Sequence, residues 1–177
     1  MAGRVLIAGI GNIFLGDDAF GVEVARRLAA RPLPPGVRVE DFGIRGFDLA
    51  YALLDGDATI LVDALPRGGA PGTLYVLEPE HEGAAGPVAP ALAAHGITPA
   101  AVLGLVAALG GRPGPLYVVG CEPADLGDEA AGGAMGLSAP VAGAVEGAVE
   151  LVLSLVGDLL AGDGAAASRH EQREVRR

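Results

Sequence analysis

Two adjacent acidic residues, Asp17 and Asp18, lie in a glycine-rich turn near the start of the chain. The turn, Gly9–Gly21 (GIGNIFLGDDAFG), follows a short apolar run typical of a β-strand and leads into a helical pattern. In an open α/β sheet, ligands bind in the crevice at the carboxyl ends of the strands, where such a turn lies. A carboxylate pair at this place favours a bound cation. The competing interpretation is that Asp17 or Asp18 only caps the helix that begins near Ala19.

A nucleotide phosphate is the other ligand that a glycine-rich turn can bind. A dinucleotide-binding turn has the pattern G-x-G-x-x-G, whereas the third glycine of this turn comes later. Two acids occupy the position of the phosphate, and no basic residue follows them before Arg26. The P-loop pattern is also missing, because no G-K-[ST] follows. Like charges oppose an anionic ligand, so we rank a nucleotide-binding domain last.

A third carboxylate and a histidine are expected to reach the same edge of the sheet. Asp63 follows the apolar strand pattern 59–62, and His95 precedes a helix on a loop long enough to reach that edge. Two carboxylates and one imidazole suit a borderline divalent ion such as Ni²⁺ or Zn²⁺. Three protein ligands leave positions open for substrate or water. The competing interpretations are that Asp63 forms a turn and that His95 lies on the surface.

Other side chains with reactive groups fit structural roles better. Asp41 falls at a strand end and is retained as an acid/base or supporting candidate. Cys121 ends another strand with no base near it in the sequence, which favours a small buried residue. Ser138 is interpreted as a helix cap, and no G-x-S-x-G motif of a serine hydrolase occurs.

The elements that must position these residues alternate between strand and helix patterns. Strands are predicted at 5–8, 37–42, 59–62, 73–77 and 116–121, and helices at 19–28, 49–54, 99–109 and 139–156. Nine residues separate Asp63 from the strand at 73–77, which is too short for a parallel crossover, so this strand is expected to be antiparallel and at an edge. The predicted fold is a three-layer α/β domain with a mostly parallel five-stranded sheet and helices on both faces.

Composition narrows the class of protein. The 177 residues suit one domain, predicted over 1–160, with a disordered tail over 161–177. The formal net charge of −10 argues against nucleic acid and anionic membrane as partners. Glu146 and Glu150 interrupt the most apolar stretch, so no membrane span is expected. Without a signal-peptide pattern and with one cysteine, we expect a cytoplasmic protein. One domain whose sheet is covered needs no partner to fold, so we expect a monomer.

Several motifs together resemble one known family. VLIAGIGNIFLGDDAFGVEV is followed in order by DFGIRGFDLAYALL, ILVDAL, PGTLYVL, a histidine before AVLGLVAAL, VVGCEP and GLSAPV. This series, over about 5–156, is similar to the hydrogenase maturation proteases, the endopeptidases that trim the C-terminus of the [NiFe]-hydrogenase large subunit. Each motif alone is weak, whereas their joint order and spacing are specific.

The resemblance implies a nickel-dependent, aspartyl-type endopeptidase whose metal ligands are Asp18, Asp63 and His95. Its substrate would be the large-subunit precursor with nickel already installed, so the precursor would contribute the metal. Many members of the family carry Glu at the position of Asp18, and the shorter Asp requires a closer approach of the backbone to the metal. An alternative is a non-catalytic, metal-dependent docking module for the same precursor.

Overall fold

The computed structural model describes residues 4–79 and 98–162, and their strands form one sheet in the order β2-β1-β3-β5-β4. The pairs β1–β2, β1–β3 and β3–β5 are parallel, and β4 is antiparallel to β5 at an edge. This confirms the predicted fold class, including the antiparallel edge strand. The strands are β1 (Val5–Ile10), β2 (Val37–Gly43), β3 (Ala58–Ala64), β4 (Leu74–Leu77) and β5 (Leu116–Cys121).

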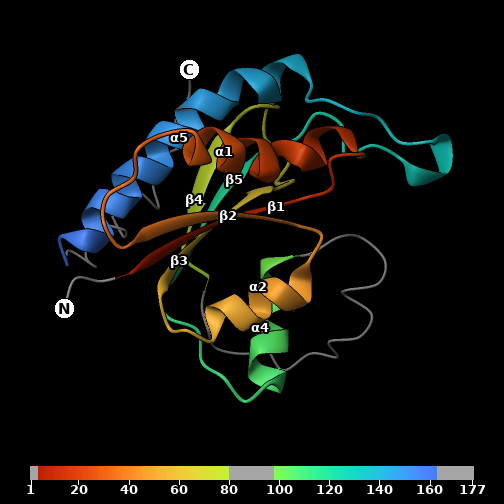
Figure 1. Ribbon diagram of the computed structural model, residues 1–177. Helices are drawn as coiled ribbons and strands as arrows, with labels where there is room; N and C mark the ends of the chain where they lie inside the picture. Colours follow the sequence, from red (N-terminus) through yellow and green to blue (C-terminus); the bar gives the residue numbers. More distant parts are fainter. Residues whose placement is uncertain (1–3, 80–97, 163–177) are drawn as a thin grey trace.

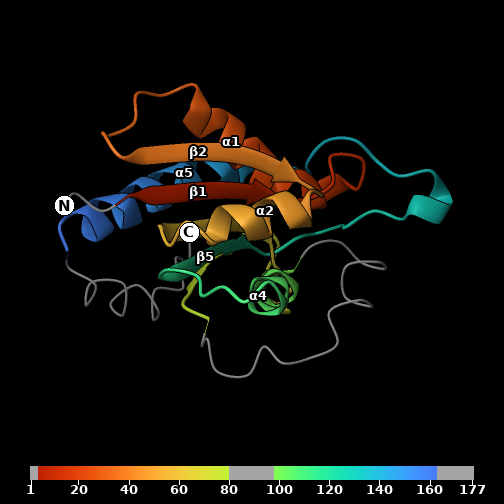
Figure 2. The same ribbon diagram turned by 60° about the horizontal axis from the view of Figure 1, so that its bottom comes forward.

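Helices cover both faces of the sheet, as Figures 1 and 2 show. One face carries α1 (Phe20–Ala29) and α5 (Ala139–Leu160), and the other carries α2 (Gly46–Leu53) and α4 (Pro99–Ala108). Two short 3-10 helices, η1 (Gly16–Ala19) and η2 (Glu129–Ala131), lie in the loops. The N-terminus of α4 is capped by Thr98, whose Oγ1 accepts a hydrogen bond from the Ala101 amide.

The alternation of side chains along β1 divides the core into two clusters. Val5 and Ile7 pack with α1 and α5, whereas Leu6, Ala8 and Ile10 pack with α2 and α4. All six residues of β1 are buried, as expected of a central parallel strand with helices on both faces. The apolar residues of the first strand therefore hold all three layers together.

The strand order creates a switch point between β1 and β3. The connection that leaves β1 leads to β2 on one side, and the connection that leaves β3 leads towards β4 on the other side. Adjacent strands whose connections diverge leave a crevice at their carboxyl ends, and this crevice is the usual ligand site of such sheets. The predicted placement of the β1 and β3 ends at one edge is thus confirmed.

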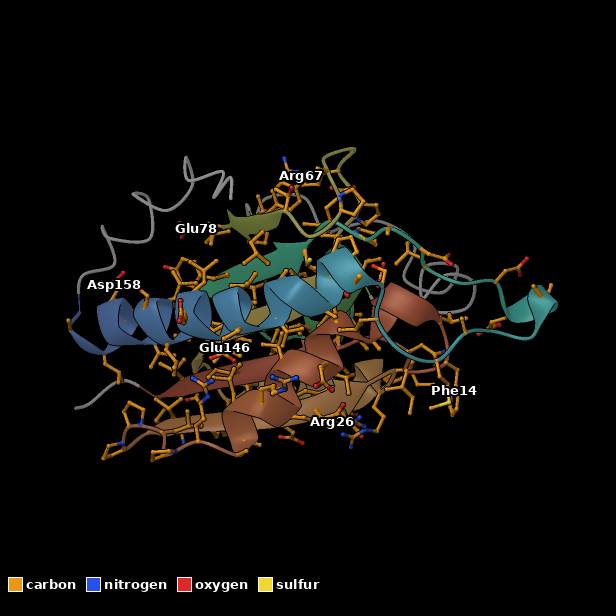
Figure 3. The ribbon with its side chains drawn as sticks, turned by 90° about the horizontal axis from the view of Figure 1, so that it is seen from above. Phe14, Arg26, Arg67, Glu78, Glu146 and Asp158 are labelled. Atoms are coloured by element: carbon orange, nitrogen blue, oxygen red, sulfur yellow. The ribbon has the colours of Figure 1, made fainter. Side chains whose placement is uncertain are left out.

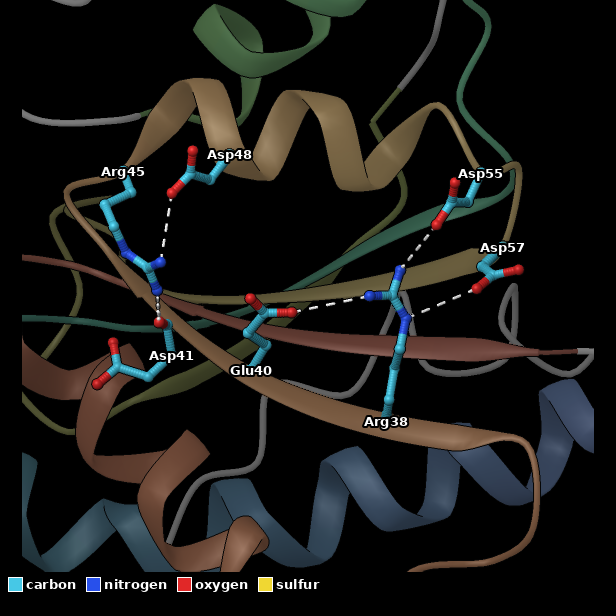
Figure 4. Close-up of polar contacts among 7 residues, drawn as sticks. All are labelled: Arg38, Glu40, Asp41, Arg45, Asp48, Asp55 and Asp57. Atoms are coloured by element: carbon cyan, nitrogen blue, oxygen red, sulfur yellow. Dashed lines mark hydrogen bonds and ion pairs between the residues drawn. The ribbon is translucent and has the colours of Figure 1, made fainter.

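Charged side chains cluster on the α2 face of the edge strand β2, near the amino ends of the strands and away from this crevice. Arg38 lies 3.7 Å from Glu40, 3.5 Å from Asp55 and 3.8 Å from Asp57 (Figure 4). Asp57 also pairs with Arg4 at 2.9 Å. Charges on an edge strand discourage pairing with another chain.

Helix α5 is long and apolar enough to cross a membrane by length and composition alone. Its valines at 141, 145, 149, 152 and 156 are buried in the cluster shared with α1 and β5. Its outer side carries Glu146, which pairs with Arg31, and Asp158 (Figure 3). The apolar stripe is therefore used within the fold, as in the core helix of a folded domain. Residues 163–177 of the predicted tail lie outside the described residues.

Candidate active site

The turn after β1 holds Asp18 against the end of that strand. The Asn12 amide donates a 2.7 Å hydrogen bond to Asp18 Oδ2. Gly11 has a φ of +134°, and a Cβ there would lie 1.7 Å from the Asp18 carbonyl oxygen. Only glycine fits such an approach, so the glycine-rich pattern serves a tight turn that presents a carboxylate.

Helix α1 starts directly over the β1–β3 crevice. A Cβ on Gly21 would lie 2.0 Å from the Val62 carbonyl oxygen and 2.4 Å from that of Ile10. Because Gly21 has no side chain, the first turn of α1 touches the backbones of both strands. This contact fixes η1, and with it Asp18, beside Asp63.

Asp17 has a different task from that of Asp18. Its side chain is fully buried, and Oδ2 accepts from the amides of Ala124 and Asp125 and from the Ser138 hydroxyl, while Oδ1 accepts from the Ser138 amide. Burial raises the pKa of Asp17, but these hydrogen bonds outweigh it and leave the pKa below the ordinary value. Asp17 thus ties η1 to the loop after β5 and to the start of α5.

These contacts assign different roles to Asp17 and Asp18, which the sequence could not distinguish, and they correct two interpretations of helix caps. Neither Asp17 nor Asp18 caps a helix: both lie inside η1, and no side-chain cap hydrogen bond is found at η1 or α1. Ser138 stands at the N-cap position of α5, but its hydroxyl donates to Asp17 instead of capping the helix.

Asp63 lies inside β3, not after it as predicted. The strand continues to Ala64 because β5 pairs with it as far as Cys121. Burial raises the pKa of Asp63 well above its ordinary value, and the negative charge of Asp18 raises it further. Burial also raises the pKa of Asp18, although the Asn12 amide opposes the shift. Two partly desolvated carboxylates therefore interact at the switch point.

Two predicted site residues, Asp41 and His95, remain, and the structure describes only Asp41. Asp41 lies near the end of β2, is partly exposed, and has its Oδ2 3.6 Å from Arg26 Nε. His95 lies outside the described residues. Among residues 4–79 and 98–162, no three His, Cys, Asp or Glu side chains form a group that could hold a metal ion. Of the three predicted metal ligands, the structure therefore describes only the two carboxylates, Asp18 and Asp63.

Glu122 is a buried acid that sequence reasoning missed. It follows β5 and accepts hydrogen bonds from the Arg67 and Gly68 amides and from the Tyr75 hydroxyl. It thus fixes the loop between β3 and β4. The sequence did offer a signal for it, because Glu122 directly follows the apolar strand pattern 116–121 and has no basic residue beside it in the sequence. Cys121 beside it is fully buried, as expected of a small core residue.

Comparison with known proteins identifies relatives of this chain. A family model described as hydrogenase maturation protease matches residues 22–155. The hydrogenase expression/formation protein HupM of Azotobacter chroococcum is 36% identical over 88% of this chain and 72% of its own length. The hydrogenase 2 maturation protease of Escherichia coli is 34% identical over 85% of this chain and 89% of its own length.

A solved structure shows the same fold. The hydrogenase maturating endopeptidase HybD from E. coli is similar with a TM-score of 0.68 and 32% identity, over 88% of this chain and 93% of that one.

Proposed function

This chain belongs to the hydrogenase maturation protease family, and we propose that it removes a C-terminal peptide from the nickel-loaded large-subunit precursor of a [NiFe] hydrogenase. The observation that supports this most strongly is the pair of carboxylates, Asp18 and Asp63, at the switch point between β1 and β3. Neither forms an ion pair with a basic side chain within the described part of the chain.

A divalent cation fits these two carboxylates chemically. Burial raises the pKa of both carboxylates, and the negative charge of Asp18 raises the pKa of Asp63 further. A bound cation would offset both effects. Carboxylates joined by an imidazole suit nickel, and His95 is the proposed third ligand. The two acids lie on a strand and a 3-10 helix that are fixed by hydrogen bonds, so little reorganisation would accompany binding.

The proposed reaction is hydrolysis of one peptide bond of the precursor. Nickel carried by the precursor would polarise the scissile carbonyl or a bound water when docked. Asp18 and Asp63 would orient the metal-bearing segment, and a carboxylate that is not engaged with the metal would accept the proton of the attacking water. Asp41, next to the crevice, is a second candidate for this proton transfer.

The test uses purified chain with nickel-loaded and nickel-free precursor, and the change in precursor mobility is measured. We expect processing only of the nickel-loaded form. Asp18→Asn and His95→Ala should abolish it, whereas Asp48→Asn, an exposed acid on α2, should leave it unchanged. Full processing by both site variants would reject these roles, and equal processing of nickel-free precursor would reject the dependence on nickel.

A docking module without catalysis would use the same residues, and family membership makes it the weaker alternative. Mass spectrometry separates the two, because only a protease produces a large subunit that has lost its C-terminal peptide. If the precursor binds and its mass stays unchanged, the docking module is correct.

A further inference from the structure

The carboxylate of Asp63 lies on the same face of the sheet as helix α2. Its neighbours in β3, Val62 and Ala64, pack in the cluster with α1 and α5. Because side chains alternate along a strand, the Asp63 side chain lies on the opposite face, which α2 and α4 cover. A partner that reaches Asp63 therefore meets the carboxyl ends of the strands on their α2 side.

The strand register gives the distance from Asp63 to the turn between β2 and α2. Gly43 at the end of β2 pairs with Ile10 of β1. Ile10 in turn lies beside Asp63, because the residues that precede the two in β1 and β3 are paired. Gly43 is thus two strands away from Asp63, which is about 10 Å at the usual spacing of strands in a sheet. The turn that leads into α2 therefore begins close to the candidate active site.

Three large apolar side chains are exposed beside this site: Phe14, Ile44 and Phe47, which we call the apolar rim. Their exposed fractions are 58%, 65% and 57%. Ile44 lies in the turn after β2, and Phe47 lies in the first turn of α2. Phe14 projects from the turn after β1 (Figure 3). Its amide donates to Asn12 Oδ1 at 3.0 Å, and the Asn12 amide binds the Asp18 carboxylate. Large apolar side chains exposed beside a ligand site are typical of a protein-binding surface.

Hydrogen bonds hold the two turns of the apolar rim in a fixed shape. The Gly11 amide donates to the Gly43 carbonyl oxygen at 3.0 Å, which joins the turn after β1 to the turn after β2. Arg45 Nε donates to the Phe42 carbonyl oxygen at 3.2 Å, and its guanidinium carbon lies 5.8 Å from the centre of the Phe42 ring. The Arg45 guanidinium also donates to the Asp41 carbonyl oxygen (Figure 4). A surface that is already ordered loses little conformational entropy when it binds a partner.

The position of the apolar rim determines which partner covers it. A stable protein interface covers about 800 Å² of each partner, which corresponds to a patch of roughly 16 Å radius. Such a patch centred on Asp63 includes the turn with Ile44, at about 10 Å. It also includes Phe47, about 5 Å further along the start of α2. A protein that brings a peptide bond to Asp63 must therefore cover the rim, and under the proposed function that protein is the large-subunit precursor.

We propose that the apolar rim is the docking surface for the large-subunit precursor, which buries Phe14, Ile44 and Phe47 when its scissile bond reaches the two carboxylates. This proposal rests on the substrate of the proposed function and adds the surface that holds this substrate. The rim contacts parts of the precursor that do not react, so these contacts are equally strong before and during the reaction. They therefore contribute to KM and leave kcat unchanged.

Two aromatic residues of α2 provide a matched test. Phe47 and Tyr51 are 57% and 58% exposed, but Tyr51 lies about 6 Å further along the helix and outside the expected interface. Phe47→Ala should raise KM for nickel-loaded precursor about 5- to 30-fold with kcat unchanged, and Ile44→Ala should act in the same direction. Tyr51→Ala should leave both constants unchanged. All three variants should unfold thermally close to wild type, because the side chains that they remove are exposed.

Cross-linking locates the partner directly. The photoreactive residue p-benzoylphenylalanine replaces Phe47 in one sample and Tyr51 in the control. Irradiation with nickel-loaded precursor should link position 47, and not position 51, to the large subunit. A link from position 47 to a second copy of this chain, with none to the precursor, would overturn the proposal.

The outcomes separate this proposal from the proposed function. An unchanged KM in both Phe47→Ala and Ile44→Ala overturns the docking surface while proteolysis by the wild-type chain stands. An equal rise of KM in Phe47→Ala and Tyr51→Ala would reflect α2 as a whole and also overturns it. If position 47 is linked to the precursor but the wild-type chain leaves the precursor at full mass, proteolysis is overturned and the docking surface stands.

Discussion

Asp17 and Asp63 are both buried carboxylates, yet their neutralisation should change stability in opposite directions. Asp17 accepts four hydrogen bonds, from the amides of Ala124, Asp125 and Ser138 and from the Ser138 hydroxyl. The pKa of Asp63, by contrast, is raised by burial and by the charge of Asp18. We therefore expect Asp17→Asn to destabilise the fold and Asp63→Asn to stabilise it at pH 7 in metal-free buffer.

The size of the Asp17 effect follows from its donors. Asparagine keeps one acceptor oxygen but turns an NH₂ group towards a backbone amide, and an unsatisfied buried group costs about 1–3 kcal/mol. The bonds that remain lose their ionic character, which is worth about 1 kcal/mol more. Asp17→Asn should thus lower the free energy of unfolding by roughly 2–4 kcal/mol, or the urea midpoint by about 1–2 M.

The pH dependence gives each variant a distinct sign. Because hydrogen bonds lower the folded-state pKa of Asp17 despite its burial, its stabilisation is complete above the ordinary value of 3.8 and is lost as pH falls through the folded value. The difference between wild type and Asp17→Asn should therefore shrink in acid. The folded-state pKa of Asp63 is raised by burial and by Asp18, so its stabilisation is present below 3.8 and is lost as pH rises through the folded value. The advantage of Asp63→Asn should therefore grow with pH.

Urea titrations from pH 2.5 to 8, followed by circular dichroism, measure both effects, with the exposed Asp48→Asn as the control. An Asp17→Asn variant as stable as wild type at pH 7 would refute the anchoring role of Asp17. An Asp63→Asn variant less stable than wild type across the range would refute the burial and repulsion of Asp63.

Two further predictions follow from the packing and the buried thiol. Gly21→Ala should lower the free energy of unfolding by about 1–3 kcal/mol and reduce processing, because its Cβ would meet the backbones of β1 and β3. Gly143→Ala on α5, where the space around the glycine is open, should instead stabilise the helix. Equal stability of the two variants in thermal unfolding would contradict the close contact at Gly21. Burial, aided by the negative charges of Asp17 and Glu122, raises the pKa of the Cys121 thiol to about 12, so Cys121 should react with a disulfide reagent only on unfolding, and rapid labelling of the native protein would contradict its burial.

Periodicity and turn residues were sufficient to predict most of the fold. Runs of apolar residues located all five strands, and the short connection after Asp63 identified the antiparallel edge strand. The end of β3 was misplaced because a local pattern does not reveal that β5 pairs with it through Ala64.

The candidate site was harder to predict because its assignments depend on distant contacts. Asp17 and Asp18 have the same side chain, and the segment 124–138, more than 100 residues away, binds Asp17 and not Asp18. The same contact explains why Ser138 does not act as a cap. His95 stays a prediction of the sequence, because it lies outside the described residues.

The most direct test of the proposed site is the mass of nickel-loaded precursor after incubation with wild type and with Asp63→Asn. Since Asp63→Asn is expected to fold at least as stably as wild type, loss of its activity reports on chemistry and not on folding. We expect wild type to release the C-terminal peptide and Asp63→Asn to leave the precursor at full mass. Release of the peptide by Asp63→Asn at the wild-type rate would contradict the proposed site.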